Sequence, residues 1–389
     1  MNRLWILAGA VAMQLCLGAT YAWSVFVGPL RAATGMSQGE AQLPFALFYL
    51  VFPFTTIFAG RIVERWGPRR SAVAGSLLFA AGWMLASQGS RSFLLTIAGI
   101  GILSGAGVGL AYLVPIAVGV RWFPRRKGLI TGFAVAGFGG GAALVSLLAG
   151  ELMVSRGVDP FAAFAWLGVA FALVGSAGAS AMRFPSGEAV TAAPPLGAGA
   201  ILKEKPFRYL YVAMVTGLAA GFAVNANLTK LLSPADLTAG SAAVALFALA
   251  NAGGRFAWGA MFDASSAAKI LTANLLAQAV VVIAAATQSM IPFPSVVIPL
   301  LAGFNYGGVL VLYAATSSRV WGGKRVAEVY GLLFSANIVA APVPVLFALG
   351  HDWTGSFNAG LVILFLLLAA GAALVWRGRA YFNILMRNQ

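Results

Sequence analysis

The sequence predicts an all-α integral membrane protein with twelve transmembrane helices in two six-helix halves. Composition is the first observation: of 389 residues, 60% are hydrophobic and 9% are charged, whereas a soluble domain has about 25% charged residues. Length is the second, because the chain accommodates about a dozen apolar helices of ~20 residues with short connections. The third is one long polar segment, 183–207, which divides the apolar stretches six and six.

The apolar stretches place the spans in order. The first resembles a signal peptide at residues 1–19, but we expect it to be uncleaved because its apolar run continues to about Phe26. Each stretch is long enough to cross the hydrocarbon core as a helix. The expected spans lie near 4–28, 41–61, 71–88, 93–119, 128–151, 160–182, 208–230, 241–262, 269–289, 294–318, 327–349 and 357–376.

Few side chains could form a metal or catalytic centre. Cys16, the single cysteine, lies in an apolar run, so a disulfide framework and a thiolate metal site are excluded. His351, the single histidine, stands beside Asp352, where we expect an ordinary loop residue. The phosphate loop G-x-x-x-x-G-K-[ST] does not occur, so ATP-driven transport within this chain is not expected. We expect no cofactor, no metal and no enzymatic activity.

Positive charge is distributed unevenly over the connections. Those that follow odd-numbered spans carry four Lys and Arg residues, and the other side carries twenty. The positive-inside rule therefore places both termini and the 183–207 segment in the cytoplasm. The net charge of +15 encodes this topology, so the bilayer is the expected surrounding and no nucleic acid is expected as a partner.

The segment 183–207 is rich in Pro, Gly and Ala, which is typical of a flexible linker. It separates an N-terminal half, 1–182, from a C-terminal half, 208–389. Two six-span halves joined by a cytoplasmic linker resemble the plan of the major facilitator superfamily. The resemblance implies a substrate site between the halves, near the midplane of the membrane.

A charged loop carries the same resemblance. Residues 60–70 read GRIVERWGPRR, similar to the superfamily's G-x-x-x-D-R-x-G-R-R loop, with Glu64 where Asp is usual. Residues 259–263, GAMFD, are a shorter echo after the eighth span, which predicts pseudo-symmetric halves. We expect the glycines to allow close helix approach and the charges to clamp neighbouring cytoplasmic helix ends; an ordinary basic loop is the alternative. The residues of this gating motif are Gly60, Glu64, Arg65, Gly67, Arg69, Arg70, Gly259 and Asp263.

Arg255 lies inside the eighth expected span. Arg in the middle of a transmembrane helix costs about 3 kcal/mol on insertion scales, and the nearest acid along the chain is Asp263, two turns later. The planar guanidinium matches a carboxylate in two hydrogen bonds, so we expect a small anion as its counter-charge. Asn251, one turn earlier on the same face, would orient the guanidinium or bind the substrate. The alternative is that Arg255 snorkels to the cytoplasmic surface, ~10 Å away.

Two stretches carry a closer resemblance. Residues 21–26 read YAWSVF and residues 121–128 read RWFPRRKG, similar to the oxalate–formate antiporters and the monocarboxylate transporters of the superfamily. The likeness covers the whole chain. In those families an Arg of span eight binds the substrate carboxylate, and that position falls on Arg255.

The charges depart from both families. The animal monocarboxylate transporters carry an Asp, implicated in proton coupling, where this chain has Asn251, and a Lys in span one, where it has none. The second cation of the oxalate–formate antiporter, a Lys in span eleven, corresponds to Asn337. One cation instead of two favours a monocarboxylate, because a second buried carboxylate would cost several kcal/mol without compensation.

Mid-span aromatic residues are candidates for the rest of a site. Tyr21, Tyr112 and Tyr306 bring hydroxyl groups that need partners when buried. Phe138 and Phe334 could form an apolar wall for a methyl-bearing acid such as lactate. Helix packing is the alternative for all five.

We expect a secondary transporter that carries lactate, pyruvate or a similar monocarboxylate with a proton by alternating access, as a monomer in a bacterial inner membrane. The alternative is an anion exchanger of the oxalate–formate type. All ten acids fall in loops or at span ends, so we expect Arg255 and the anion to pair, with the proton travelling on the acid or relieving the empty Arg. An enzyme would need clustered His, Asp, Glu or Cys in the spans, and a channel would need charged rings or a filter.

Overall fold

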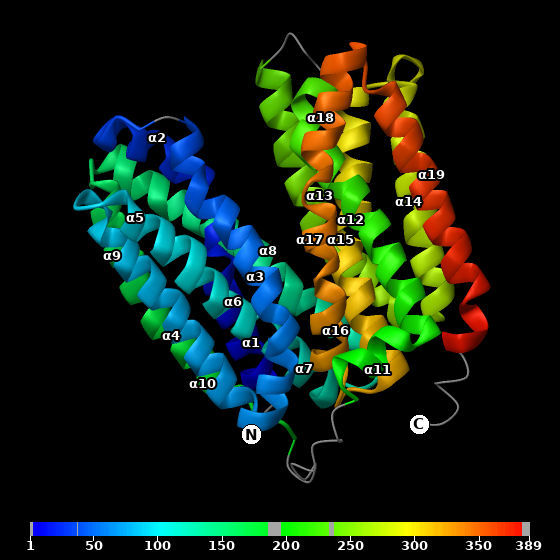
Figure 1. Ribbon diagram of the computed structural model, residues 1–389, viewed down its shortest axis with the longest axis horizontal. Coiled ribbons are helices and arrows are strands. Elements are labelled where there is room, and N and C mark those ends of the chain that lie inside the picture. The colour runs from blue at the N-terminus through cyan, green and yellow to red at the C-terminus, as the bar shows by residue number, and fades with distance from the viewer. Residues whose placement is uncertain (1–2, 37, 186–195, 233–236, 383–389) are drawn as a thin grey trace. The chain divides into compact units, whose positions relative to one another are not determined.

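The computed structural model describes residues 3–36, 38–185, 196–232 and 237–382, and within these ranges the chain is helical without β-strands (Figure 1). Two compact units form: unit 1 contains Met1–Pro124, Phe133–Pro195 and Gly323–Phe334, and unit 2 contains Arg125–Gly132, Leu196–Gly322 and Ser335–Gln389. The units interleave along the chain, and the sequential halves 1–182 and 208–389 stay a prediction. The middle of the predicted linker, 186–195, lies outside the described residues.

Unit 1 is built mainly from the helices of the N-terminal part of the chain. Its α-helices are α1 (Arg3–Leu17), α2 (Ser24–Thr34), α3 (Gln38–Trp66), α4 (Pro68–Ala86), α5 (Phe93–Thr96), α6 (Gly105–Ala111), α7 (Leu113–Trp122), most of α8 (Lys127–Gly150), α9 (Pro160–Ala170), α10 (Ser176–Ser180) and α16 (Val326–Phe334). Short 3-10 and π-helical turns connect them: η1 (Gly18–Ala22), η2 (Ser87–Ser90), η3 (Ile97–Ser104), η4 (Glu151–Ser155) and η5 (Phe171–Gly175).

Unit 2 contains the first turns of α8 and the helices that follow the linker. These are α11 (Ala198–Lys203), α12 (Lys205–Leu232), α13 (Leu237–Asp263), α14 (Ala267–Ala286), η6 (Gln288–Met290), α15 (Pro294–Trp321), α17 (Ala336–Ala340), α18 (Val343–Thr354) and α19 (Asn358–Arg377).

Eleven helical runs within the described residues are long and apolar enough to cross a membrane, and they match eleven of the predicted spans. The remaining prediction, 241–262, is covered by α13, which is helical over 27 residues but is not one of those eleven runs. The first run, Arg3–Ala22, contains α1 and the 3-10 turn η1, and it ends there rather than at residue 28 because α2 begins as a separate helix at Ser24. The predicted all-α membrane fold is confirmed.

His351 lies in the last turn of α18 and not in a loop, as its position beside Asp352 had suggested. The helix continues to Thr354 and ends at Gly355, whose φ of 72° suits a glycine after a helix. The ring centroid of His351 lies 4.3 Å from that of Phe357, so ring packing accounts for this histidine.

Unit 1 is held together by aromatic packing. The Trp23 and Phe164 rings are stacked at 5.9 Å, and Trp83 meets Phe164 edge to face at 5.5 Å. The indole Nε1 of Trp23 donates a hydrogen bond to Ala41 O at 2.9 Å, which satisfies its polar atom inside the core. These contacts tie α2, α3, α4 and α9 into one body.

Unit 2 is held together by close helix contacts at glycines. Gly303 of α15 lies against the carbonyl of Phe247, and Gly254 of α13 lies against the carbonyl of Phe304. Gly307 follows one turn after Gly303, and a Cβ there would lie 3.1 Å from Arg255 N and closer still to the Asn251 carbonyl. Small residues at this spacing let two membrane helices approach closely. The packing fixes the backbone that carries Arg255.

Candidate functional site

Arg255 and Asn251 form a buried pair on α13. The two residues are 8% and 9% exposed, and Arg255 Nε donates a hydrogen bond to Asn251 Oδ1 at 3.1 Å. Residues four apart lie on the same face of a helix, so the predicted contact between the two is present. Because Asn251 precedes Arg255 by one turn, this bond directs Nε of Arg255 towards the N-terminal part of α13.

The backbone at Arg255 is held from two sides. On α15, Gly307 contacts the backbone of Asn251 and Arg255. On the first turns of α8, a Cβ at Gly132 would lie 2.7 Å from Arg255 O. A bulkier residue at either glycine would push the helix away. The guanidinium is therefore carried by a backbone with little freedom to move, as precise recognition of a ligand requires.

Tyr306 is the predicted site tyrosine that shares unit 2 with Arg255. It is half-buried on α15, its ring centroid 6.1 Å from both Phe222 and Phe247. Asn337 is also half-buried, on α17, which packs against α12. Unit 2 thus contains four of the predicted substrate residues: Arg255, Asn251, Tyr306 and Asn337.

The other four predicted residues gather in unit 1. Tyr112, 1% exposed at the break between α6 and α7, meets Phe138 edge to face at 5.2 Å and Phe334 at 5.2 Å. Tyr21 meets Phe138 edge to face at 5.0 Å. The structure therefore brings these four side chains, which lie far apart in the sequence, into one aromatic cluster.

On α3, two rings that were not among the predicted residues also contact this cluster. Tyr49 stacks on Tyr21 at 5.5 Å with an interplanar angle of 7°. Phe52 contacts Tyr112 at 5.4 Å and Phe334 at 5.1 Å. Their signal was present in the aromatic run of span two, but several rings there also face the core. Which ring joins the cluster depends on the helix packing.

The gating motif forms a clamp in unit 1. Glu64 Oε1 accepts a hydrogen bond from Arg121 Nη2 at 2.7 Å, and the Arg121 side chain is 6% exposed. Arg121 also donates to Gly323 O at 3.0 Å and Lys324 O at 2.8 Å, which joins the ends of α3 and α7 to the start of α16. The charge-assisted bonds make this a strong contact.

The basic residue that pairs with Glu64 differs from the prediction. Arg65, Arg69 and Arg70 of the motif are exposed, whereas Arg121 belongs to the RWFPRRKG stretch of span four. Gly67 has a φ of 82° at the start of α4, a conformation that glycine adopts without strain. The motif therefore supplies the acid and the turn, and a distant helix supplies the cation.

Unit 2 has a corresponding clamp at the echo motif. Asp263 accepts hydrogen bonds from the backbone N–H of Gly128 at 2.8 Å and of Leu129 at 2.9 Å, which caps the start of α8. Gly259 and Gly128 lie in backbone contact, which brings the two helices close enough for this cap. Arg319 of α15 donates to Phe262 O at 2.7 Å and to Ser265 O, and lies over the Phe262 ring.

Glu328 is a buried acid that the sequence analysis placed at a span end. It lies in the first turn of α16 and is 6% exposed. Gly60 of α3 lies against the backbone of Ala327 and Glu328, so the close approach of α3 buries it. The position of Glu328 near the end of a predicted span therefore does not make its side chain exposed. Among the described residues, no group of three or more His, Cys, Asp or Glu side chains could hold a metal.

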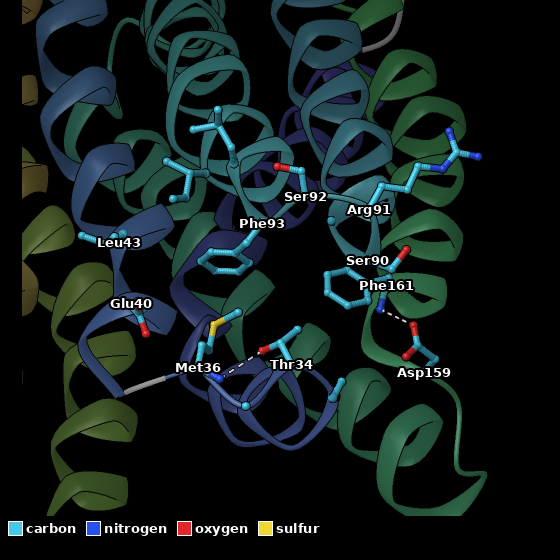
Figure 2. A pocket seen from close by; sticks show the side chains of 15 residues that line it. Thr34, Met36, Glu40, Leu43, Ser90, Arg91, Ser92, Phe93, Asp159 and Phe161 are labelled. Carbon is cyan, nitrogen blue, oxygen red and sulfur yellow. Dashed lines mark hydrogen bonds between the residues drawn. The ribbon is translucent and has the colours of Figure 1, made fainter.

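A pocket of about 820 Å³ opens in unit 1 between the end of α2 and the starts of α3, α5 and α9. Figure 2 shows Glu40 and Asp159 on opposite sides of it, with the rings of Phe93 and Phe161 between them. Asp159 Oδ1 accepts a hydrogen bond from Phe161 N at 2.8 Å, which caps α9. None of the predicted substrate residues lines this pocket.

Comparisons with known proteins agree with the architecture. A family model described as Major Facilitator Superfamily matches residues 8–344. The chain is 26% identical over 343 residues to the uncharacterised MFS-type transporter YhjX of Escherichia coli K12, covering 84% of this chain and 83% of that protein. It is 27% identical over 349 residues to the oxalate:formate antiporter of Oxalobacter formigenes, covering 87% and 82%. The structure is similar to the E. coli fucose:proton symporter, with a TM-score of 0.75, 14% identity and 99% of both chains covered.

Proposed function

Because this chain belongs to the Major Facilitator Superfamily, whose members are membrane transporters and not enzymes, we propose that it is a secondary transporter of small monocarboxylates such as lactate or pyruvate. The observation that carries the substrate class is the buried Arg255–Asn251 pair. The similarity to an oxalate:formate antiporter supports an organic anion as the substrate.

Arg255 is the proposed ligand of the carboxylate. Its Nε–Asn251 bond sets the plane of the guanidinium, and its Nη groups would bind the two carboxylate oxygens in parallel. Burial strengthens such a contact because water screens it less. Asn251 thus acts by orienting Arg255. Asn337 stands at the position of a second cation in the antiporter family. With a neutral residue there, Arg255 alone balances the charge of one carboxylate.

The aromatic residues are the proposed lining of the transport path. Tyr306, which belongs to unit 2 together with Arg255, would contribute a hydroxyl that contacts the substrate. Tyr21 and Tyr112 would contribute hydroxyls from unit 1, with Phe138 and Phe334 as apolar wall. The motif residues Gly60, Glu64, Arg65, Gly67, Arg69, Arg70, Gly259 and Asp263 are proposed to control the opening of the predicted cytoplasmic side.

Coupling to a proton is the finer part of the proposal. Arg255 and the bound anion would form a neutral pair, so a proton would enter with the acid or relieve the empty Arg. The second candidate is anion exchange, which the likeness to the oxalate:formate antiporter favours. We further propose a monomer in a bacterial inner membrane with both termini in the cytoplasm, as the charge distribution predicts.

Uptake of labelled lactate into liposomes of purified protein tests these proposals. Symport predicts uptake that rises with an inward proton gradient and needs no anion inside. Exchange predicts uptake only into liposomes preloaded with lactate or oxalate, with or without a pH gradient. Symport is excluded if net uptake proves indifferent to the gradient, and both proposals are excluded if neither condition gives uptake above protein-free liposomes.

A further inference from the structure

Gly221 of α12 faces the ring of Tyr306 on α15, and the two helices lie side by side (Figure 1). A Cβ at position 221 would lie 2.5 Å from Cε2 and 2.8 Å from Cγ of that ring, and closer still to Cδ2. Carbon atoms in contact normally stay about 3.5–4.0 Å apart. Any residue larger than glycine must therefore move the ring or separate the helices.

Two further rings pack against that of Tyr306. Phe222 meets it edge to face and Phe247 lies at a tilt, both with centroids 6.1 Å away. The carbonyl of Phe247 is itself pressed against Gly303 of α15. These rings limit the movement of the Tyr306 ring towards α12 and α13.

The backbone beside Tyr306 is tied to a third helix. Gln278 Nε2 of α14 donates to Asn274 Oδ1 at 3.0 Å, and Asn274 Nδ2 donates to Asn305 O at 2.9 Å. All three side chains are buried. Asn305 immediately precedes Tyr306, so these hydrogen bonds tie α15 to α14 at the residue next to the tyrosine.

The interface between α12 and its neighbours at Gly221 contains little free space. A cavity of about 20 Å³ lies between the four helices, lined by Gly221, Phe247, Gln278, Ala302 and neighbouring apolar residues. Such a volume holds about one water molecule and cannot take a phenol ring. Because a Cβ at Gly221 would overlap the Tyr306 ring itself, the ring and its hydroxyl would have to move relative to α12.

We infer that Gly221 is a positioning residue that sets substrate affinity by fixing the place of the Tyr306 hydroxyl. The inference rests on the proposed function, in which Tyr306 contacts the substrate. A hydrogen bond weakens steeply once its donor and acceptor move beyond about 3.2 Å or out of line. A shift of the ring by the width of a methyl group is enough to lose such a bond.

The test compares Gly221→Ala with Gly217→Ala, one turn earlier on α12. A Cβ at Gly217 would meet its nearest neighbours at 3.5 Å, an ordinary contact. We expect the lactate Kd to rise about tenfold in Gly221→Ala, the loss of one good hydrogen bond, and to stay within about twofold in Gly217→Ala. In a Tyr306→Ala background the clash is absent, so adding Gly221→Ala should change Kd by less than about twofold, because the two positions act as a unit.

A second readout needs no ligand. The single fluorine of a 3-fluorotyrosine placed at position 306 reports the surroundings of the ring by NMR of the detergent-purified protein. We expect its resonance to move in Gly221→Ala and to stay in place in Gly217→Ala. An unmoved resonance overturns the inference even if Gly221→Ala transports poorly or is unstable.

The binding outcomes separate this inference from the proposed function. If wild type binds lactate and Gly221→Ala binds it equally well, the inference fails while the role of Arg255 stands. The inference also fails if Gly221→Ala raises Kd equally with and without the Tyr306 ring. If wild type does not bind lactate at all, the proposed function fails and the inference falls with it.

Discussion

Replacing Arg255 with Gln removes the proposed ligand of the carboxylate and leaves a shorter, uncharged polar side chain. Breaking one partner of a buried charged pair costs about 3–5 kcal/mol. At 1.4 kcal/mol per tenfold, substrate binding should weaken by about two to four orders of magnitude. Arg255 is 8% exposed, so solvent screening does not reduce this figure much. Transport by Arg255→Gln should fall below detection.

The fold should survive the same change. Removing a charge from a membrane span is favourable by about 3 kcal/mol on insertion scales, against which the loss of the Asn251 hydrogen bond is small. We therefore expect the thermal midpoint of Arg255→Gln in detergent to equal or exceed that of wild type. Loss of transport with an intact midpoint assigns the defect to binding.

Arg255→Lys separates a ligand from a topological charge. Lys retains the charge but loses the planar fork and the Nε donor to Asn251. We expect lactate binding well below wild type, measured by calorimetry beside the Gln variant, with the exposed Arg91→Gln as control. A fully active Arg255→Lys variant would refute the proposal that Arg255 binds the substrate directly. If Arg255→Gln failed to insert into the membrane while Arg255→Lys inserted and transported like wild type, a topological role would be favoured.

Three further changes test charge count, clamp and coupling. Asn337→Lys should shift preference from lactate towards a dicarboxylate, seen as stronger oxalate competition of lactate uptake; an unchanged rank order would contradict its proposed place. Asp263→Ala removes both acceptor bonds at the start of α8 and should lower stability by about 1.5–3 kcal/mol, whereas the exposed ion-pair residue Glu151→Ala should stay within about 1 kcal/mol; equal thermal midpoints would contradict the clamp. Glu328→Gln should leave lactate uptake dependent on the proton gradient. If this variant still exchanged anions but its uptake no longer responded to the gradient, Glu328 would instead be identified as the proton carrier.

The long apolar stretches specified most of the membrane architecture, because burial in lipid requires about 20 consecutive apolar residues for each helix. The Arg255–Asn251 contact was also accessible from the sequence, since helical periodicity alone brings residues four apart together. The charged loop and its echo indicated where acids would meet helix ends. These are local properties of the chain, and each depends on one helix or one loop.

The tertiary structure decided which distant groups meet. Arg121, 57 positions from Glu64 along the chain, is the base of the unit 1 clamp, and no pattern within either helix selects it over the exposed bases of the motif. Burial of Glu328 follows from the approach of Gly60, and the place of the Tyr306 ring follows from the bare backbone of Gly221. Contacts between helices depend on rotation and depth of packing, which hydropathy does not encode. Only the packed helices show which glycine faces which side chain.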